Sequence, residues 1–434
     1  MNKHISFLPA CFQKALPGQS AIHITKFFLV LLCALPAVSW AQVDKQALIV
    51  DTTHVEPEIV NVAYGTKHKD QVTGAIYTVS GEELYNTHNA TLSNTFFGRL
   101  PGVVAQQNPG APGYEDASLY IRGLHTFGNN SFLVLLDGFE IDSYRQISAE
   151  EVESVTVLKD AAALALYGVA GANGAILIKT KRGTASDKVN IGFKARYGYQ
   201  APEQLPEFMG SYDYARLYNE ALRNDGLQPR YSAEELEGYK SGADPYLYPD
   251  VNWYDEVLRK ESSIQDYYLT FDGGSDKATY FLLLGYMDNQ GLYANTNQER
   301  SSNISFQRIN FRGNTDIRIT ESLTAQVGLG GFIEDRKFPP GGTDNLWREM
   351  ATYAPNVYPA LTPDGKITGS ANFPNNPLGY LRRGYQSRHN RNVQATVRLD
   401  EKLDFITKGL SVFGAVSFSS VLTNGYDKTR SYAY

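Results

Sequence analysis

The sequence predicts an exported protein made of an α+β domain followed by antiparallel strands of a transmembrane β-barrel. Three observations predict this: a signal-like N-terminus, strict alternation of apolar and polar residues in the second half, and connections between those strands that alternate in length. The expected order is a signal peptide at 1–41, a leader at 42–69, the α+β domain at 70–185 and barrel strands over 186–434.

Residues 1–41 are typical of a secretory signal peptide. They hold three lysines, no acidic residue, and an apolar run over 27–38 that precedes the small-x-small site Ser39-Trp40-Ala41. Cys11 and Cys33 both lie in this segment, so the exported part offers no disulfide and no thiolate metal site. With the three lysines removed, 37 basic residues face 46 acidic ones, which argues against a nucleic-acid partner.

The α+β domain alternates short strands with short helices. Asp160 is the expected N-cap of a helix over 160–167, and Ser148-Ala149-Glu150-Glu151 is a capping box that starts one helical turn and accounts for its two carboxylates. An amphipathic helix is expected over 91–99, and strands are expected over 74–79, 103–107, 118–122, 132–136, 153–159 and 175–180.

Gly168, Gly171 and Gly174 have the spacing of a phosphate-binding loop, but their order in the chain is wrong. A nucleotide fingerprint follows a strand and opens a helix, because the phosphate binds the free amides of the helix N-terminus. Here the glycines follow a helix and precede the strand at 175–180, so we expect them to permit a tight connection, with Gly168 in a left-handed conformation. No cofactor, metal site or catalytic group is predicted: the exported histidines form no metal pair, and no serine lies in a nucleophile elbow.

Alternation is clearest over 189–200, where Val189, Ile191 and Phe193 share one side of a strand with Lys194 and Arg196 on the other. Segments at 264–272, 277–287, 303–319, 323–329, 393–399 and 410–420 bring the total to seven strands, with a β-bulge expected between 306 and 309.

The strand connections over 201–263, 288–302 and 333–391 are long, whereas those over 273–276, 320–322 and 401–409 are short. A membrane barrel has this asymmetry, with long loops outside. The main alternative is a soluble sandwich, in which such an asymmetry is not expected.

Several stretches resemble SusC/RagA-type TonB-linked (TonB-dependent) outer-membrane proteins. "LVLLDGFEIDSYRQISAEEVESVTVLKDAAALALYGVAGANGAILIKTKRG" at 133–183 looks like the plug-domain signature of this family. "LYIRGL" at 119–124, residues 59–84 and the hairpin "DGGSDKATYFLLLGYMDNQGLY" at 272–293 are also similar to it. The resemblance implies a plug inside an outer-membrane barrel of about 22 strands. The seven strands are then an incomplete barrel, and the chain is expected to be an N-terminal fragment.

The resemblance also implies the function and the partners. Members take up oligosaccharides or peptides actively, driven by the inner-membrane TonB complex and assisted by a SusD-like surface lipoprotein, and they are not enzymes. A TonB box is expected at Glu58-Ile59-Val60-Asn61-Val62, where an extended segment suits strand addition; the alternative is an ordinary leader. The importer itself has two alternatives: a secreted or surface β-rich binding or adhesion protein, and a ligand-sensing receptor that does not transport.

Two groups of residues are the candidate functional positions. The first group should hold the plug by polar contacts that can be broken reversibly, and it comprises Arg122, Gly123, Asp137, Gly138, Lys159 and Asp160. Arg122 is expected to face acids of the barrel wall; the alternative is that it faces solvent. Gly168, Gly171 and Gly174 complete the plug motif. The second could stack on sugar rings or anchor the barrel at the membrane interface: Tyr246, Tyr248, Tyr353 and Tyr358.

Overall fold

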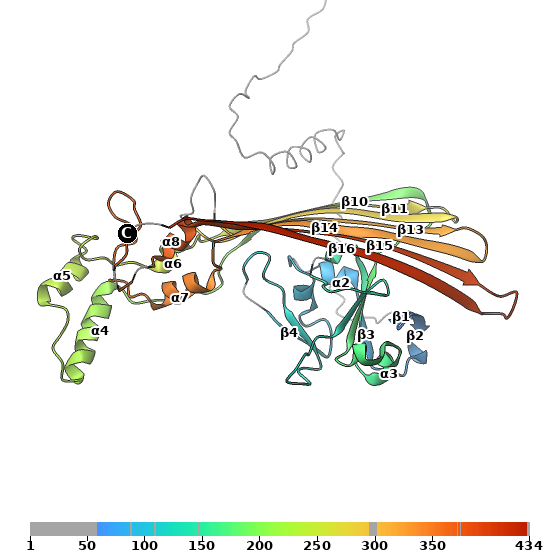
Figure 1. Cartoon of the computed structure of the whole chain (residues 1–434), viewed down its shortest axis with the longest axis horizontal. Helices are drawn as coiled ribbons and strands as arrows, with labels where there is room; N and C mark the ends of the chain where they lie inside the picture. The colour runs from blue at the N-terminus through green and yellow to red at the C-terminus, as the bar shows by residue number, and fades with distance from the viewer. Residues whose placement is uncertain are drawn as a thin grey trace, which may run out of the picture. The chain divides into compact units, whose positions relative to one another are not determined.

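The computed structural model describes residues 59–431, apart from 87–88, 108–109, 146, 295–301, 371 and 374. The expected signal peptide and Glu58 lie outside the described residues. The described part consists of an α+β domain and a seven-stranded antiparallel sheet, shown in Figure 1. Among the helices in this part, none has the length and apolar character needed to cross a membrane.

The α+β domain is organised around a five-stranded sheet in the order β3-β8-β9-β6-β7. The strands are β3 (Ile76–Ser80), β6 (Leu133–Leu136), β7 (Phe139–Glu140), β8 (Val152–Leu158) and β9 (Ala175–Thr180). β9 runs parallel to β6, and the other pairs are antiparallel. Apolar side chains of β8 and β9 are almost completely buried, and residues 175–178 of β9 form a continuous apolar run. Two further pairs are β1 (Ile59–Val62) with β2 (Gly65–His68), and β4 (Val103–Gln106) with β5 (Ser118–Ile121).

Short helices connect these strands, and their caps match the sequence signals. The Ser148 side chain and Glu151 form the expected capping box of η3 (Ala149–Glu151), and Asp160 caps α3 (Ala161–Leu164) through the Ala163 amide. The remaining pieces are η1 (Lys69–Gln71), α2 (Gly81–Tyr85), η2 (Ser93–Phe96) and η4 (Ala165–Gly171).

The helix predicted over 91–99 is wrong, because only the 3-10 turn η2 forms there. Its polar side chains bond to the backbone and so compete with α-helical hydrogen bonding: Thr95 Oγ1 donates to the Leu92 carbonyl at 2.7 Å, and Asn94 Nδ2 donates to the Glu115 carbonyl at 2.7 Å.

The second half forms one open sheet in the order β10 to β16, so the sandwich alternative is not adopted. Its strands are β10 (Ser186–Gln200), β11 (Ser262–Gly274), β12 (Ala278–Gln290), β13 (Ser305–Arg318), β14 (Leu323–Phe338), β15 (Gly384–Lys402) and β16 (Ser411–Thr429). The bulge predicted between Phe306 and Ile309 is wrong, since residues 305–317 of β13 pair in unbroken register with both neighbours. Phe306 interrupts the alternation because it is an apolar residue on the otherwise polar side, packed against Ala90 and Met287.

The long and short connections alternate as predicted, and Figure 1 shows the helices of the long ones gathered at one end of the strands. The helices themselves were not predicted: α4 (Ser211–Asn224), α5 (Ala233–Ser241), α6 (Trp253–Val257), α7 (Asp344–Thr352) and α8 (Pro377–Arg382). Trp253, Leu346 and Leu378, from α6, α7 and α8, share one apolar core. The strands also extend further into these connections than expected, to Phe338 in β14 and from Gly384 in β15.

Candidate functional site

The seven-stranded sheet has one apolar and one polar side. One row of paired residues crosses all seven strands and is entirely apolar: Ile191, Phe271, Leu282, Gly313, Leu329, Ala395 and Phe418. A row on the opposite side is polar apart from its methionine: Arg196, Asp266, Met287, Arg308, Glu334, Asn390 and Thr423. The apolar side is open, with Ile191 66% and Leu329 48% exposed. We call it the outward side.

The α+β domain lies against the polar, inward side and is held there by ion pairs, of which Arg312–Glu151 is buried. Arg312 of β13 donates from Nε to Glu151 Oε2 at 2.9 Å, and these side chains are only 6% and 2% exposed. Lys194 of β10 donates to Glu150 Oε2 at 2.8 Å, and Arg196 lies 3.7 Å from Glu150 Oε1. The two carboxylates of the η3 capping box are therefore the binding points for three cations of the sheet.

Hydrogen bonds extend this contact. Asn314 Nδ2 donates to Thr180 Oγ1 at 2.8 Å, and the same hydroxyl donates to Asp137 Oδ2 at 2.7 Å. Arg308 NH2 donates to the Ala90 carbonyl at 2.9 Å. Because Thr180 is fully buried and Asn314 is 1% exposed, these bonds form away from bulk water, where losing a partner is costly.

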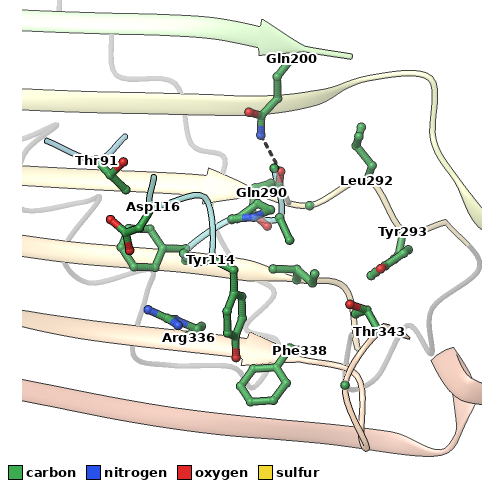
Figure 2. Close-up of a pocket in the computed structure, with 18 of the residues that line it drawn as sticks. Thr91, Tyr114, Asp116, Gln200, Gln290, Leu292, Tyr293, Arg336, Phe338 and Thr343 are labelled. Carbon is green, nitrogen blue, oxygen red and sulfur yellow. Dashed lines mark hydrogen bonds between the residues drawn. The ribbon is translucent and has the colours of Figure 1, made fainter. Parts of the chain in front are cut away.

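A cavity of about 1250 Å³ lies between the domain and the loop end of the sheet. Figure 2 shows Tyr114 and Asp116 of the domain facing Gln200, Gln290, Arg336 and Phe338 of the strands, with Tyr293 and Thr343 of the long connections at the far side. Aromatic, cationic and acidic side chains all reach it, so the cavity can offer stacking surfaces together with hydrogen-bond donors and acceptors.

The segment around Tyr114 is tightly fitted to the wall of this cavity. The Arg336 guanidinium lies 4.5 Å from the centre of the Tyr114 ring, and Phe338 meets the same ring edge-on at 5.9 Å. Gly113 has φ 76°, and a Cβ there would come within 2.6 Å of Phe306 and 2.8 Å of Arg336 Nε. Glycine is required at this position both by its conformation and by the close approach.

Two neighbouring carboxyls beneath the cavity have shifted pKa values. Burial, together with the adjacent Asp116, raises the pKa of Glu115 to about 7, although Arg308 and an amide hydrogen bond from Asn289 oppose the shift. Burial also raises the pKa of Asp116, against the lowering effect of Arg145, which lies 3.7 Å away, and of Arg308. The contact between domain and sheet therefore includes a group that titrates near neutral pH.

Comparison with known proteins supports the resemblance from two directions. The sequence profile of the TonB-dependent receptor plug domain matches residues 68–175. The chain is 26% identical over 382 residues to the TonB-dependent receptor SusC of Bacteroides thetaiotaomicron, covering 83% of this chain and 36% of that protein. It is 32% identical over 286 residues to the TonB-dependent receptor P3 of Formosa agariphila, covering 66% of this chain and 25% of the relative. The plug profile and these relatives support a SusC/RagA-type TonB-dependent receptor.

The fold agrees with this assignment. The structure of the RagAB peptide importer in its "open-open" state matches with a TM-score of 0.69 at 21% identity, over 85% of this chain and 43% of that one. The α+β domain is the plug of the receptor and the seven strands are part of its barrel, as predicted. The chain spans about a third of the length of SusC and a quarter of that of P3.

The candidate TonB box lies in the receptor's first hairpin. Ile59–Val62 forms β1, paired with β2, and Asn61 Nδ2 donates to Ser154 Oγ of β8 at 3.0 Å. The segment is extended as predicted, but only Ile59 is well exposed at 64%, whereas Val60 is 3% exposed. Its role as a TonB box stays a prediction.

Arg122 lies on the plug beside Lys159 and Asp160, in a smaller cavity of about 410 Å³, and Gly123 follows it in the chain with a φ of 91°. Arg122 is exposed, and in the described part of the chain no ion pair joins it to an acid of β10–β16. Its contact with a barrel acid stays a prediction. Hydrogen bonds from the Ala163 and Ala75 amides lower the pKa of Asp160, and burial with the nearby Arg122 lowers that of Lys159.

The other plug positions have structural roles. Asp137 and Gly138, both with positive φ, form the tight turn between β6 and β7, and Asp137 also binds Thr180. Gly168 has the expected positive φ of 56°, although its ψ of −138° lies outside the left-handed helical region. A Cβ on Gly174 would come within 2.6 Å of Ile121, and Gly171 packs on Leu164, so the connection is as tight as predicted.

The ligand-stacking prediction needs correction for part of the tyrosines. Tyr358 is 6% exposed and belongs to the core of the long connections, with Trp253 edge-on at 5.6 Å. Tyr353 packs against Trp253, Tyr358 and Phe373, so both rings pack within the protein. Tyr248 covers Gly238 and meets Tyr239 edge-on, while Tyr246 is 48% exposed. None of the four is among the described residues that line the large cavity.

The residues that join plug and wall were not predicted from the sequence. Glu150 and Glu151 were explained by the cap alone, yet each also binds a cation of the sheet. A signal for their partners was present in the sequence of β13, where Arg308, Arg312 and Asn314 fall on one side of the strand at even spacing.

Proposed function

We propose that this chain supplies the plug and part of the wall of an outer-membrane importer that takes up an oligosaccharide or peptide nutrient, driven by TonB. A SusD-like lipoprotein is the proposed surface partner, and an N-terminal signal peptide the proposed route of export. Such a receptor performs no catalysis: binding and a conformational change of the plug are sufficient for transport.

One observation carries the proposal: the plug binds a wall that is polar on the plug side and apolar on the other. Such a wall suits lipid outside and a polar lumen inside. The buried pair Glu151–Arg312 and the partly exposed pair Glu150–Lys194 hold the plug without a covalent bond, so a pull on the plug can separate them. The cavity of about 1250 Å³ lies at the loop end, where a nutrient would arrive.

A reversible plug–wall tether tests this function. The given sequence has only Cys11 and Cys33, both within the proposed signal peptide, so a Thr180→Cys/Asn314→Cys pair would add the sole thiols to residues 42–434. These side chains are in direct contact in the structure. Cells producing the full-length receptor should accumulate labelled oligosaccharide or peptide only with active TonB, and the oxidised pair should stop accumulation until a reductant is added.

Each single-cysteine variant is the matched control, since it carries the same substitution without the tether. Ligand binding without TonB-dependent accumulation would contradict import and favour a sensing receptor. Full accumulation through the oxidised tether would contradict plug movement at this contact.

A further inference from the structure

The outward side of the wall changes from apolar to polar at one level near the loop end. The row Tyr197, Gln265, Asp288, Gln307, Asp335, His389 and Asn424 is polar across all seven strands. In the row below it, Tyr286 and Tyr267 lie among apolar residues and direct their hydroxyls to Asp288, at 3.4 Å, and to Gln265, at 3.2 Å. Aromatic rings with polar tips mark membrane interfaces, so this level corresponds to the lipid headgroups.

Three cations lie near this level on neighbouring strands, spread over four successive outward rows. Arg391 of β15 is in the last apolar row, Lys337 of β14 is in the second polar row, and Lys428 of β16 pairs with Tyr385 one row further. All three are exposed. We call them the cationic patch. The corresponding outward positions of β10 to β13 contain no cation: Tyr197, Tyr199, Ser263, Gln265, Asp288, Gln290, Ser305 and Gln307.

The acids nearest to the patch are bound elsewhere. Asp335 accepts a hydrogen bond from His389 Nδ1, and Asp427 binds Arg388, whose guanidinium lies over Phe338 on the inward side. In the described part of the chain, none of the three patch cations has an ion-pair partner. Among the described residues, no ion pair therefore neutralises the positive charge of the patch.

The chain Ser387–His389–Asp335 within this region has the order of a catalytic triad, but it does not provide an accessible nucleophile. Ser387 Oγ lies 3.1 Å from His389 Nε2 and is fully buried, and the His389 ring packs 5.9 Å from Tyr426. The arrangement holds His389 against Asp335.

We propose that the cationic patch binds the phosphate groups of an anionic lipid in the outer leaflet. This inference rests on the proposed outer-membrane location. The patch is continuous with the apolar rows, where Ile333 and Leu422 lie beside Arg391, so one lipid can place its chains on these residues and its phosphate on the cations. A guanidinium binds phosphate through two parallel donors, and the two ammonium groups add point charges. A soluble phosphate ion would gain nothing from contact with the apolar residues, whereas lipid chains would be buried against them.

The test measures binding of diphosphoryl lipid A to the purified full-length receptor in mixed micelles. The variant K337Q/R391Q/K428Q removes the patch. The matched control K277Q/K402Q/K408Q removes three exposed lysines at or near the short-turn end of the strands. At about 1 kcal/mol for each cation near an anionic headgroup, the patch variant should bind about a hundredfold more weakly, and the control within threefold of the wild type.

Equal binding by wild type and patch variant would overturn the proposal, as would an equal loss in the control. Complete competition by inorganic phosphate at the lipid concentration would identify a free phosphate site and also overturn it. Uptake by the same patch variant separates this inference from the proposed function. If the patch variant imports in a TonB-dependent way and still binds lipid A normally, the lipid site is contradicted and the proposed function is not.

Discussion

Replacing Arg312 with methionine removes the wall cation from Glu151 while keeping much of the side-chain volume. The pair is 2.9 Å apart and almost completely buried, so the change leaves a carboxylate enclosed without its cation. Removing one partner of a buried pair costs about 3–5 kcal/mol. Glu151 keeps one hydrogen bond, from the Ser148 amide at 2.7 Å, which places the expected cost at the lower end, about 3 kcal/mol.

Plug opening can be measured by labelling a single cysteine at Ala90, which is 8% exposed and packs against Phe306 of the wall. If the thiol reacts only when the plug leaves the wall, its rate reports the free energy of opening. About 3 kcal/mol corresponds to roughly hundredfold faster labelling in the full-length receptor with Arg312→Met.

Arg216→Met is the matched control for this prediction. Arg216 lies 3.7 Å from Asp213 with both side chains about half exposed, and such surface pairs contribute at most about 1 kcal/mol. A labelling rate for Arg312→Met within threefold of the wild type, or equal to that of the control, would refute the view that buried ion pairs hold the plug.

Two further predictions use the same assay. The pKa of Glu115 is raised from 4.5 to about 7 in the docked plug, so docking is favoured at acidic pH and this contribution falls as pH rises from about 4.5 to about 7. Labelling, normalised to an exposed cysteine, should therefore be faster at pH 8 than at pH 5, and a Glu115→Gln variant that keeps the full pH dependence would contradict this assignment. Gly113→Ala should speed labelling at least about tenfold, because a positive φ adds strain of about 1–2 kcal/mol and the new Cβ meets Phe306 and Arg336. Gly341→Ala, with a similar φ of 78° but open space around it, isolates the strain, so an equal effect in both variants would show that the close approach of Gly113 to the wall has no role.

Local and periodic signals predicted much of this fold. The caps at Ser148 and Asp160 depend on residues within one turn, and they form as expected. The strands follow from alternation with period two. The alternation of long and short connections predicted which end of the sheet has the long loops. Phe306 shows the limit of this reasoning: its position looks like a register break in the sequence, but it is an inward aromatic residue that packs on Ala90, some 200 residues earlier in the chain.

The site was harder to predict because it is formed by residues far apart in sequence. Glu151 and Arg312 meet across 161 positions, and the local cap already explains the glutamate. Tyr353 and Tyr358 were misjudged for a related reason: composition shows that aromatic residues are abundant in the long connections, but not that Tyr358 is enclosed by Trp253. Charge complementarity between plug and wall becomes visible only when the register of β10 and β13 is known.

The central claim is that lipid contacts the outward side of the sheet and that the plug and the polar lumen contact the inward side. A nitroxide scan along β15 from Val393 to Leu399, in the full-length receptor reconstituted in bilayers, tests it most directly. Val393, Val397 and Leu399 are outward and 43–46% exposed, whereas the inward Gln394 is 6% exposed. The account predicts that accessibility to oxygen dissolved in lipid rises at every odd position and falls at every even one. Equal accessibility at odd and even positions would contradict it.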